Sequence, residues 1–212
     1  MQIESAYDHA RFVASPLANA YVDFQEITGL ETLTGLEQLW LGQNKITALT
    51  GLSTLSNLRS LSIQANRITS LDGIEALPKL EELYISDNLL TSLEPLSNTP
   101  NLVILDVQNN PITSLKGVGP LKKLETFWAT GCKLDSFEDM ERELRDKKHL
   151  SEVYFEETPL QKAGPILYRN KVRLALPQVE KIDASKYFAW VMVQYKAANQ
   201  TSLRPSMTIP MR

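Results

Sequence analysis

The sequence predicts an α/β solenoid, a curved right-handed superhelix with a concave parallel β-sheet and a helical C-terminal cap. Three observations lead to this fold class. A nine-residue segment returns every 22 residues between Leu36 and about Asp135. Within each copy apolar and other residues alternate, as in a strand that is buried on one face. In most copies the segment ends on asparagine, whose side chain can bond to the backbone where the chain turns inward.

The segment has the pattern LxxLxLxxN, which is the leucine-rich repeat. The copies are LEQLWLGQN from Leu36, LRSLSIQAN from Leu58, LEELYISDN from Leu80, LVILDVQNN from Leu102 and LETFWATGC from Leu124, with a looser sixth copy, LSEVYFEET, from Leu150. The ninth position holds Asn44, Asn66, Asn88 and Asn110, then Cys132 and Thr158. A period kept through five copies does not arise from composition alone.

Four positions of each repeat are expected to face inward. They are two on the strand (Leu39 and Leu41, Leu61 and Ile63, Leu83 and Ile85, Leu105 and Val107, Phe127 and Ala129), one on the turn (Ile46, Ile68, Leu90, Ile112, Leu134) and one on the return (Leu49, Leu71, Leu93, Leu115). One repeat cannot bury these faces alone, so the coils must stack. Each buried side chain stabilises the fold by roughly 1.5–3 kcal/mol relative to exposure.

The ninth-position asparagines are expected to bond to the backbone of their own coil and the next, and each lost bond would cost about 1–3 kcal/mol. Cys132 fits the same position as a small, weakly polar group. That structural role is preferred over a catalytic or metal-binding one, because the chain has no second cysteine.

The N-terminal residues 1–23 do not fit the repeat, and the repeats occupy residues 24–160. Phe24, Ile27, Leu30 and Leu33 match the return half of a repeat, so the chain enters the solenoid partway through one. Residues 5–14 form either a short helix over the open end or no regular structure.

After the fifth copy, the spacing from Phe127 to Val153 is four residues longer than the period. Ser136 and Asp139 have the spacing of a capping box, which predicts a helix. Phe137, Met140 and Leu144 then share one helical face. Arg145, Lys147, Lys148 and His149 follow, and a solvated basic face is favoured there over a nucleic-acid patch.

Residues 161–184 are expected to cap the stack, followed by an atypical tail, residues 185–212. Pro165 suits the first turn of a helix and Pro177 ends it. The apolar side of this helix would be Ile166, Leu167, Val172 and Leu174–Leu176. Val179 and Ile182 would add a last strand. In the tail, FAWVMV could dock on the cap, and the end has no expected structure.

Outward strand positions should form columns on the concave side, and these are the candidate binding residues. The central column holds Trp40, Ser62, Tyr84, Asp106, Trp128 and Tyr154, flanked by Glu82 and Glu152 among others. The eighteen outward positions hold four acids, Glu156 included, and no Lys or Arg. Aromatic anchors beside acids suit a protein partner with basic and apolar patches. The alternative is that the rings only pack across neighbouring strands.

Composition and missing motifs narrow the function further. The chain has 212 residues, net charge −3 and one cysteine, which suits a reducing compartment. It carries no motif for phosphate binding, nucleophilic catalysis or zinc, and neither His9 nor His149 has metal-ligand spacing with the cysteine. We therefore expect no enzyme activity, cofactor, metal or small-molecule substrate. The acidic concave face disfavours nucleic acid, and FAWVMV is too short to cross a membrane.

Several segments resemble the leucine-rich-repeat regulatory subunits of protein phosphatase 1 (regulatory subunit 7, the SDS-twenty-two type). They are LEQLWLGQNKIT, LRSLSIQANRIT, LEELYISDN and LKKLETFW, followed by VYFEETPLQK, YRNKVRLALP and QVEKIDA. The likeness covers roughly Phe24 to Ala184 and corresponds to the C-terminal half of that family's repeats. One departure is Thr126, which stands where the family usually has an acid.

The resemblance implies a non-enzymatic scaffold of nucleus and cytoplasm that binds the protein phosphatase 1 catalytic subunit on its concave face. It implies Trp40, Tyr84, Asp106, Trp128 and Tyr154 as contact positions. The alternative is a leucine-rich-repeat interaction module in another nuclear or cytoskeletal assembly.

Overall fold

The computed structural model describes residues 11–13 and 25–183, and the account below concerns these. The chain divides into two units, residues 1–182 and 183–212; the tail from residue 185 lies outside the described part, and so do residues 1–10. The elements of the first unit are β1 (Arg11–Val13), β2 (Gln38–Trp40), β3 (Ser60–Ser62), η1 (Ile74–Ala76), β4 (Glu82–Tyr84), η2 (Glu94–Asn98), β5 (Ile104–Asp106), β6 (Thr126–Trp128), α1 (Phe137–Leu144), β7 (Glu152–Tyr154), α2 (Pro159–Lys162), α3 (Pro165–Ala175) and β8 (Lys181–Ile182).

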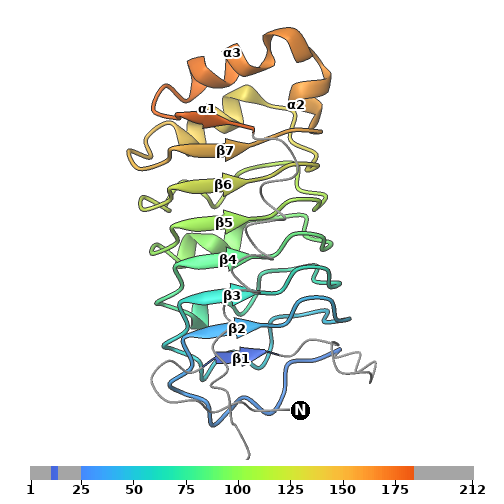
Figure 1. Ribbon diagram of the computed structural model, residues 1–212, viewed down its shortest axis with the longest axis vertical. Helices are drawn as coiled ribbons and strands as arrows, with labels where there is room; N and C mark the ends of the chain where they lie inside the picture. Colours follow the sequence, from blue (N-terminus) through green and yellow to red (C-terminus); the bar gives the residue numbers. More distant parts are fainter. Residues whose placement is uncertain (1–10, 14–24, 184–212) are drawn as a thin grey trace, which may run out of the picture. The chain divides into compact units, whose positions relative to one another are not determined.

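The strands form one parallel sheet in which each strand pairs with the next along the chain (Figure 1). Gln38 pairs with Ser60, Ser60 with Glu82, and so on, so each coil starts in register with its neighbour. This is the predicted leucine-rich-repeat solenoid. The N-terminal end differs from expectation. For residues 5–14 we expected either a short helix or no regular structure, but Arg11–Val13 is a strand paired with β2.

The predicted inward positions are buried throughout the repeats. Strand residues such as Leu61 and Ile63, turn residues such as Ile68 and return residues such as Leu71 have no exposed surface. Ile27 and Leu30 belong to the same core, and Leu33 packs against it. Phe24 lies outside the described residues. A repeat pattern identifies this core because identical coils bury the same positions each time.

The asparagines form a ladder of hydrogen bonds between coils. Asn66 Nδ2 donates to Ile63 O in its own coil at 3.0 Å and to Leu41 O of the preceding coil at 2.9 Å. Asn66 Oδ1 accepts from Ile46 N at 3.0 Å. The bond within the asparagine's own coil was predicted, but the second coil that it contacts is the preceding one and not the next one. Leu41 N donates to Ser62 O of the following coil, so the carbonyl of Leu41 faces that coil too and meets its asparagine.

Cys132 takes the ladder position, as predicted. Its Sγ lies 3.3 Å from Val107 O of the preceding coil, which is the bond that asparagine makes elsewhere. Burial raises the pKa of this thiol to about 12, so it stays protonated near neutral pH. A protonated, buried thiol is a poor nucleophile, which agrees with a structural role.

Helix α1 forms where the sequence predicted it, with Met140 and Leu144 buried and Phe137 partly buried. Ser136 Oγ accepts from Asp139 N at 3.1 Å. The carboxylate of Asp139 accepts instead from Leu115 N of the preceding coil, at 2.7 Å. The capping box is therefore half formed, because the preceding coil offers this acid a backbone N–H.

The basic cluster after α1 is not one solvated face. Lys147 is fully buried, and its Nζ donates to Gly119 O at 2.9 Å. Burial lowers its pKa to about 8. Arg145 pairs with Glu141 on α1, while Lys148 and His149 are exposed. The sequence prediction was wrong for Lys147, because it took four neighbouring basic residues to share one environment.

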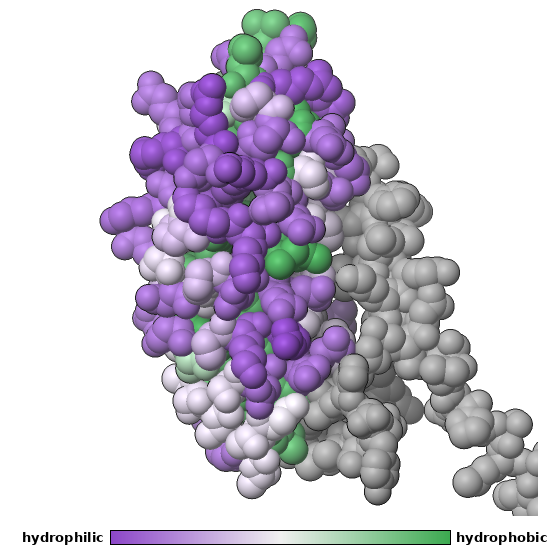
Figure 2. Space-filling view, turned by 90° about the vertical axis from the view of Figure 1, so that its left-hand side faces the viewer, coloured by the Kyte–Doolittle hydropathy of each residue, from purple (hydrophilic) through white to green (hydrophobic). Residues whose placement is uncertain are grey.

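Helix α3 begins at Pro165 and ends before Pro177, as expected. The face that it buries is only partly the predicted one: Val172, Ala175 and Leu176 are buried as expected, together with Tyr168, which was not predicted. Ile166, Leu167 and Leu174 point to solvent, and Figure 2 shows hydrophobic residues at this end of the surface. A helix with two apolar stripes can bury only one against the stack, and the stripe with Tyr168 occupies the core. Strand β8 includes Ile182 but not Val179.

Candidate functional site

The predicted column of binding residues exists as a geometric feature of the sheet. In each three-residue strand the middle residue enters the core and the outer two face the other way. We call the face made by the first and third residues of β2–β7 the open face. The third residues are in register from strand to strand and lie outside the hydrophobic core: Trp40, Ser62, Tyr84, Asp106, Trp128 and Tyr154.

The rings of this column pack on one another. Trp128 stacks on Tyr154 with ring centroids 5.7 Å apart, and Tyr84 lies 6.4 Å from Trp128 at a tilt of 47°. The rings therefore do pack across strands, which was the alternative to a binding role in the sequence analysis. Tyr84 and Tyr154 are only 8% and 4% exposed, whereas Trp40 and Trp128 are half-buried. The two tryptophans are the more accessible rings, and Tyr154 fixes the position of Trp128.

Asp106 sits between Tyr84 and Trp128 in register and is 3% exposed. Its Oδ1 accepts from the backbone N and from Nε2 of Gln108, both at 3.1 Å. Burial raises the pKa of Asp106 to about 6, even though hydrogen bonds from Gln108 and Ser86 act to lower it. The carboxyl group thus changes charge close to neutral pH.

Glu82 accepts hydrogen bonds on the open face from two neighbours. Ser60 Oγ donates to its Oε2 at 3.0 Å and the Tyr84 hydroxyl donates at 3.3 Å. Burial, together with the charges of Glu82 and Asp106, raises the pKa of Tyr84. The phenol stays neutral and available as a donor.

Glu152 belongs to a small charged network at the other end of the column. It accepts from Trp128 Nε1 at 3.2 Å and from Lys181 Nζ at 3.0 Å. Burial raises the pKa of Glu152, but hydrogen bonds from Tyr154, Lys181 and Trp128 outweigh it and the pKa is lowered. This carboxylate is ionised and holds the Trp128 indole in place.

Lys181 is the site residue that the sequence reasoning missed. It is the first residue of β8, pairs with Glu152 in register and lies 5.4 Å above the Tyr154 ring. The predicted strand around Ile182 contained the signal, because Lys181 immediately precedes Ile182. The open face therefore has a cation at its C-terminal edge, although the expected columns held none.

Other kinds of site find no support in the described part of the chain. Among residues 11–13 and 25–183 there is no group of three or more His, Cys, Asp or Glu side chains arranged to hold a metal ion. In the same residues no helix is long and apolar enough to span a bilayer.

Comparison with known proteins supports the repeat assignment. The family described as Leucine Rich repeats (2 copies) matches residues 56–98. A curated relative, protein phosphatase 1 regulatory subunit SDS22 of Schizosaccharomyces pombe, is 55% identical over 58 residues, which are 27% of this chain. The match spans only 18% of the length of that relative.

Solved structures show the same fold. A leucine-rich-repeat protein of Leptospira interrogans aligns with a TM-score of 0.63 at 28% identity, over 76% of this chain and 41% of that one. An internalin of Listeria monocytogenes aligns with a TM-score of 0.58 at 21% identity, over 76% and 52%. At this identity the internalin indicates the fold alone.

Proposed function

Because this leucine-rich-repeat chain resembles the SDS22 regulatory subunit of protein phosphatase 1, we propose that it is a non-enzymatic scaffold that docks the phosphatase catalytic subunit. The 58-residue segment at 55% identity is the observation that carries the proposal. The proposed docking surface is the open face of the sheet. We propose the nucleus and cytoplasm as its location, which imaging of the tagged chain would test.

The chemistry of the open face suits such a partner. Trp40 and Trp128 are half-buried, so each offers ring surface to a partner, and the stack on Tyr154 also holds Trp128 in position. Tryptophan is among the commonest hot-spot residues of protein interfaces. Glu152 lies beside Trp128 and Glu82 lies beside Tyr84 on the same face, and these acids favour a partner surface with basic groups. Tyr84, Asp106 and Tyr154 are more deeply buried and support the contact residues from within the face.

The test is binding of the full chain to the isolated phosphatase 1 catalytic subunit, measured by calorimetry. We expect the double variant Trp40→Ala/Trp128→Ala to lose at least about tenfold in affinity, since hot-spot truncations commonly cost more than 1.4 kcal/mol. The control variant Glu138→Lys changes an exposed acid on α1, away from the sheet, and should bind like the wild type.

Two results would contradict the proposal at different levels. Equal affinity of the wild type and the double tryptophan variant would place the contact elsewhere on the chain. Absence of binding by the folded wild type would reject the phosphatase partner and favour the alternative, an interaction module of another nuclear or cytoskeletal assembly.

A further inference from the structure

Large hydrophobic side chains gather on the outer surface of α3. Among the described residues four large hydrophobic side chains are exposed, and three of them belong to this helix: Ile166 at 92%, Leu174 at 75% and Leu167 at 58%. Ile166 and Leu174 are eight residues apart and Leu167 follows Ile166, so all three fall within about 100° of the helix circumference. Single exposed leucines are ordinary, but a cluster on one helix face marks a contact surface.

The exposure of this face follows from how α3 is anchored. Tyr168, Val172 and Ala175 on the opposite side pack into the core of the stack. Because that side already holds the helix, the outward side chains are not needed for the cap to close the repeat array. The outer face of α3 and the open face are built from different elements, since the first belongs to the helical cap and the second to the sheet.

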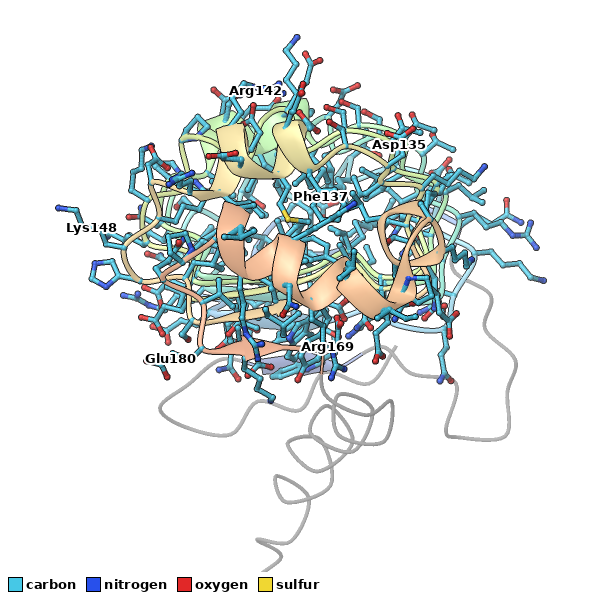
Figure 3. All side chains as sticks on the ribbon, turned by 90° about the horizontal axis from the view of Figure 1, so that it is seen from above. Asp135, Phe137, Arg142, Lys148, Arg169 and Glu180 are labelled. Carbon is cyan, nitrogen blue, oxygen red and sulfur yellow. The ribbon has the colours of Figure 1, made fainter. Side chains whose placement is uncertain are left out.

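The charged side chains of α3 itself are of one sign. Helix α3 carries Arg169, Lys171 and Arg173 and no acid. The guanidinium of Arg169 lies 4.0 Å from Oε1 of Glu156. The Nζ atom of Lys171 lies 5.4 Å from the ring centroid of Phe137, the residue seen between α1 and α3 in Figure 3. Two of the cations thus have partners outside the helix, and Arg173 follows the helix circumference about 20° from Ile166, so the exposed hydrophobic residues share α3 with basic side chains.

We propose that the outer face of α3 binds an acidic amphipathic helix of a partner protein. Ile166, Leu167 and Leu174 take the apolar stripe of that helix, and the cations of α3 pair with acids that flank the stripe. This surface is independent of the open face, so the chain can hold two partners at once.

Charge distinguishes this occupant from two others. A second copy of the chain docking α3 on α3 would bring two sets of three cations together. A bilayer with anionic lipids would lie against α1 as well, which packs beside α3 and carries Glu138, Asp139, Glu141 and Glu143. A single helix is narrow enough to contact α3 and avoid those acids.

The test uses the full chain, labelled with ¹⁵N, and a fluorescent synthetic helix that has leucine at positions i, i+3, i+4 and i+7 and glutamate on both flanks. We expect saturable binding by anisotropy, with amide shifts confined to α3. The double variant Ile166→Ser/Leu174→Ser should weaken binding at least tenfold, and Arg173→Glu should weaken it at least threefold. Leu89→Ser, which changes the exposed leucine outside α3, is the matched control and should bind like the wild type.

Every other result overturns the proposal. Equal binding by the α3 double variant and the Leu89→Ser control would mean non-specific capture of the peptide. Binding of the chain to phosphatidylserine vesicles but not to the peptide would identify a membrane surface. A dimer in solution that Ile166→Ser/Leu174→Ser dissociates, with no peptide bound, would identify self-association.

Discussion

The indole of Trp128 lies flat on the phenol of Tyr154, with centroids 5.7 Å apart and planes only 11° from parallel. The two residues are direct neighbours in β6 and β7, so the parallel register itself brings the rings together. Glu152 and Lys181 then fix the pair from one side through hydrogen bonds and a cation–π contact. An aromatic surface built this way is ordered in the free chain, and such order would lower the entropic cost of the proposed binding.

Removal of one ring of this pair should destabilise the fold. Tyr154→Ala should lower the free energy of unfolding by about 3 kcal/mol, since it deletes a buried aromatic ring and its stack. Tyr154→Phe keeps the stack and loses only the hydroxyl, so a loss of about 1 kcal/mol is expected. Urea denaturation measures both values, and similar losses for the two variants would show that the ring stack contributes nothing.

The asparagine ladder should be costly to break. Asn88 Oδ1 accepts from Ile68 N at 2.9 Å, and its Nδ2 donates to Ile63 O at 3.1 Å, both in the preceding coil. Asn88→Ala leaves these buried backbone groups without the bond, and we expect a loss of about 3 kcal/mol. Asn98→Ala, an exposed control, should change stability by less than about 0.5 kcal/mol. Comparable losses in thermal or urea denaturation would argue against the ladder.

Asp106 should make stability depend on pH. Its folded pKa of about 6 is above the value of about 3.9 for an unfolded aspartate, so the folded chain binds the extra proton between these values. Stability from this group is therefore full below about pH 4 and falls as pH rises to 6. Asp106→Asn should be more stable than the wild type by about 2–3 kcal/mol at pH 7 and lose that advantage at pH 4. If urea titrations give the same difference in free energy of unfolding between the variant and the wild type at pH 4 and at pH 7, the raised pKa of Asp106 is refuted.

Lys147 should make the free energy of unfolding rise with pH in the alkaline range, opposite to the effect of Asp106. Its folded pKa of about 8 is below the unfolded value of about 10.4, so burial of the charge costs free energy below pH 8 and that cost disappears toward pH 10.5. The wild type should therefore gain stability relative to Lys147→Met between pH 8 and 10, by about 2 kcal/mol. Parallel curves for the two proteins in chemical denaturation would contradict the assignment.

Much of the fold follows from periodicity alone. The 22-residue repeat predicted the coils, the inward residues and the ladder position of Cys132, because each coil must bury the same positions against its neighbours. The helix after Ser136 and its inward face were also predictable, since its capping and spacing are local properties.

What the sequence by itself determined was therefore the repeating core and the alignment of Trp40 through Tyr154 on one face of the sheet. The tertiary structure decided three things that depend on residues distant in sequence. It placed Lys181 against Glu152, it buried Lys147 on the carbonyl of Gly119, and it chose the Tyr168 stripe of α3 for the core. Periodicity specifies which residues can face inward, but only packing between coils selects among equally apolar faces and sets the surroundings of each charge.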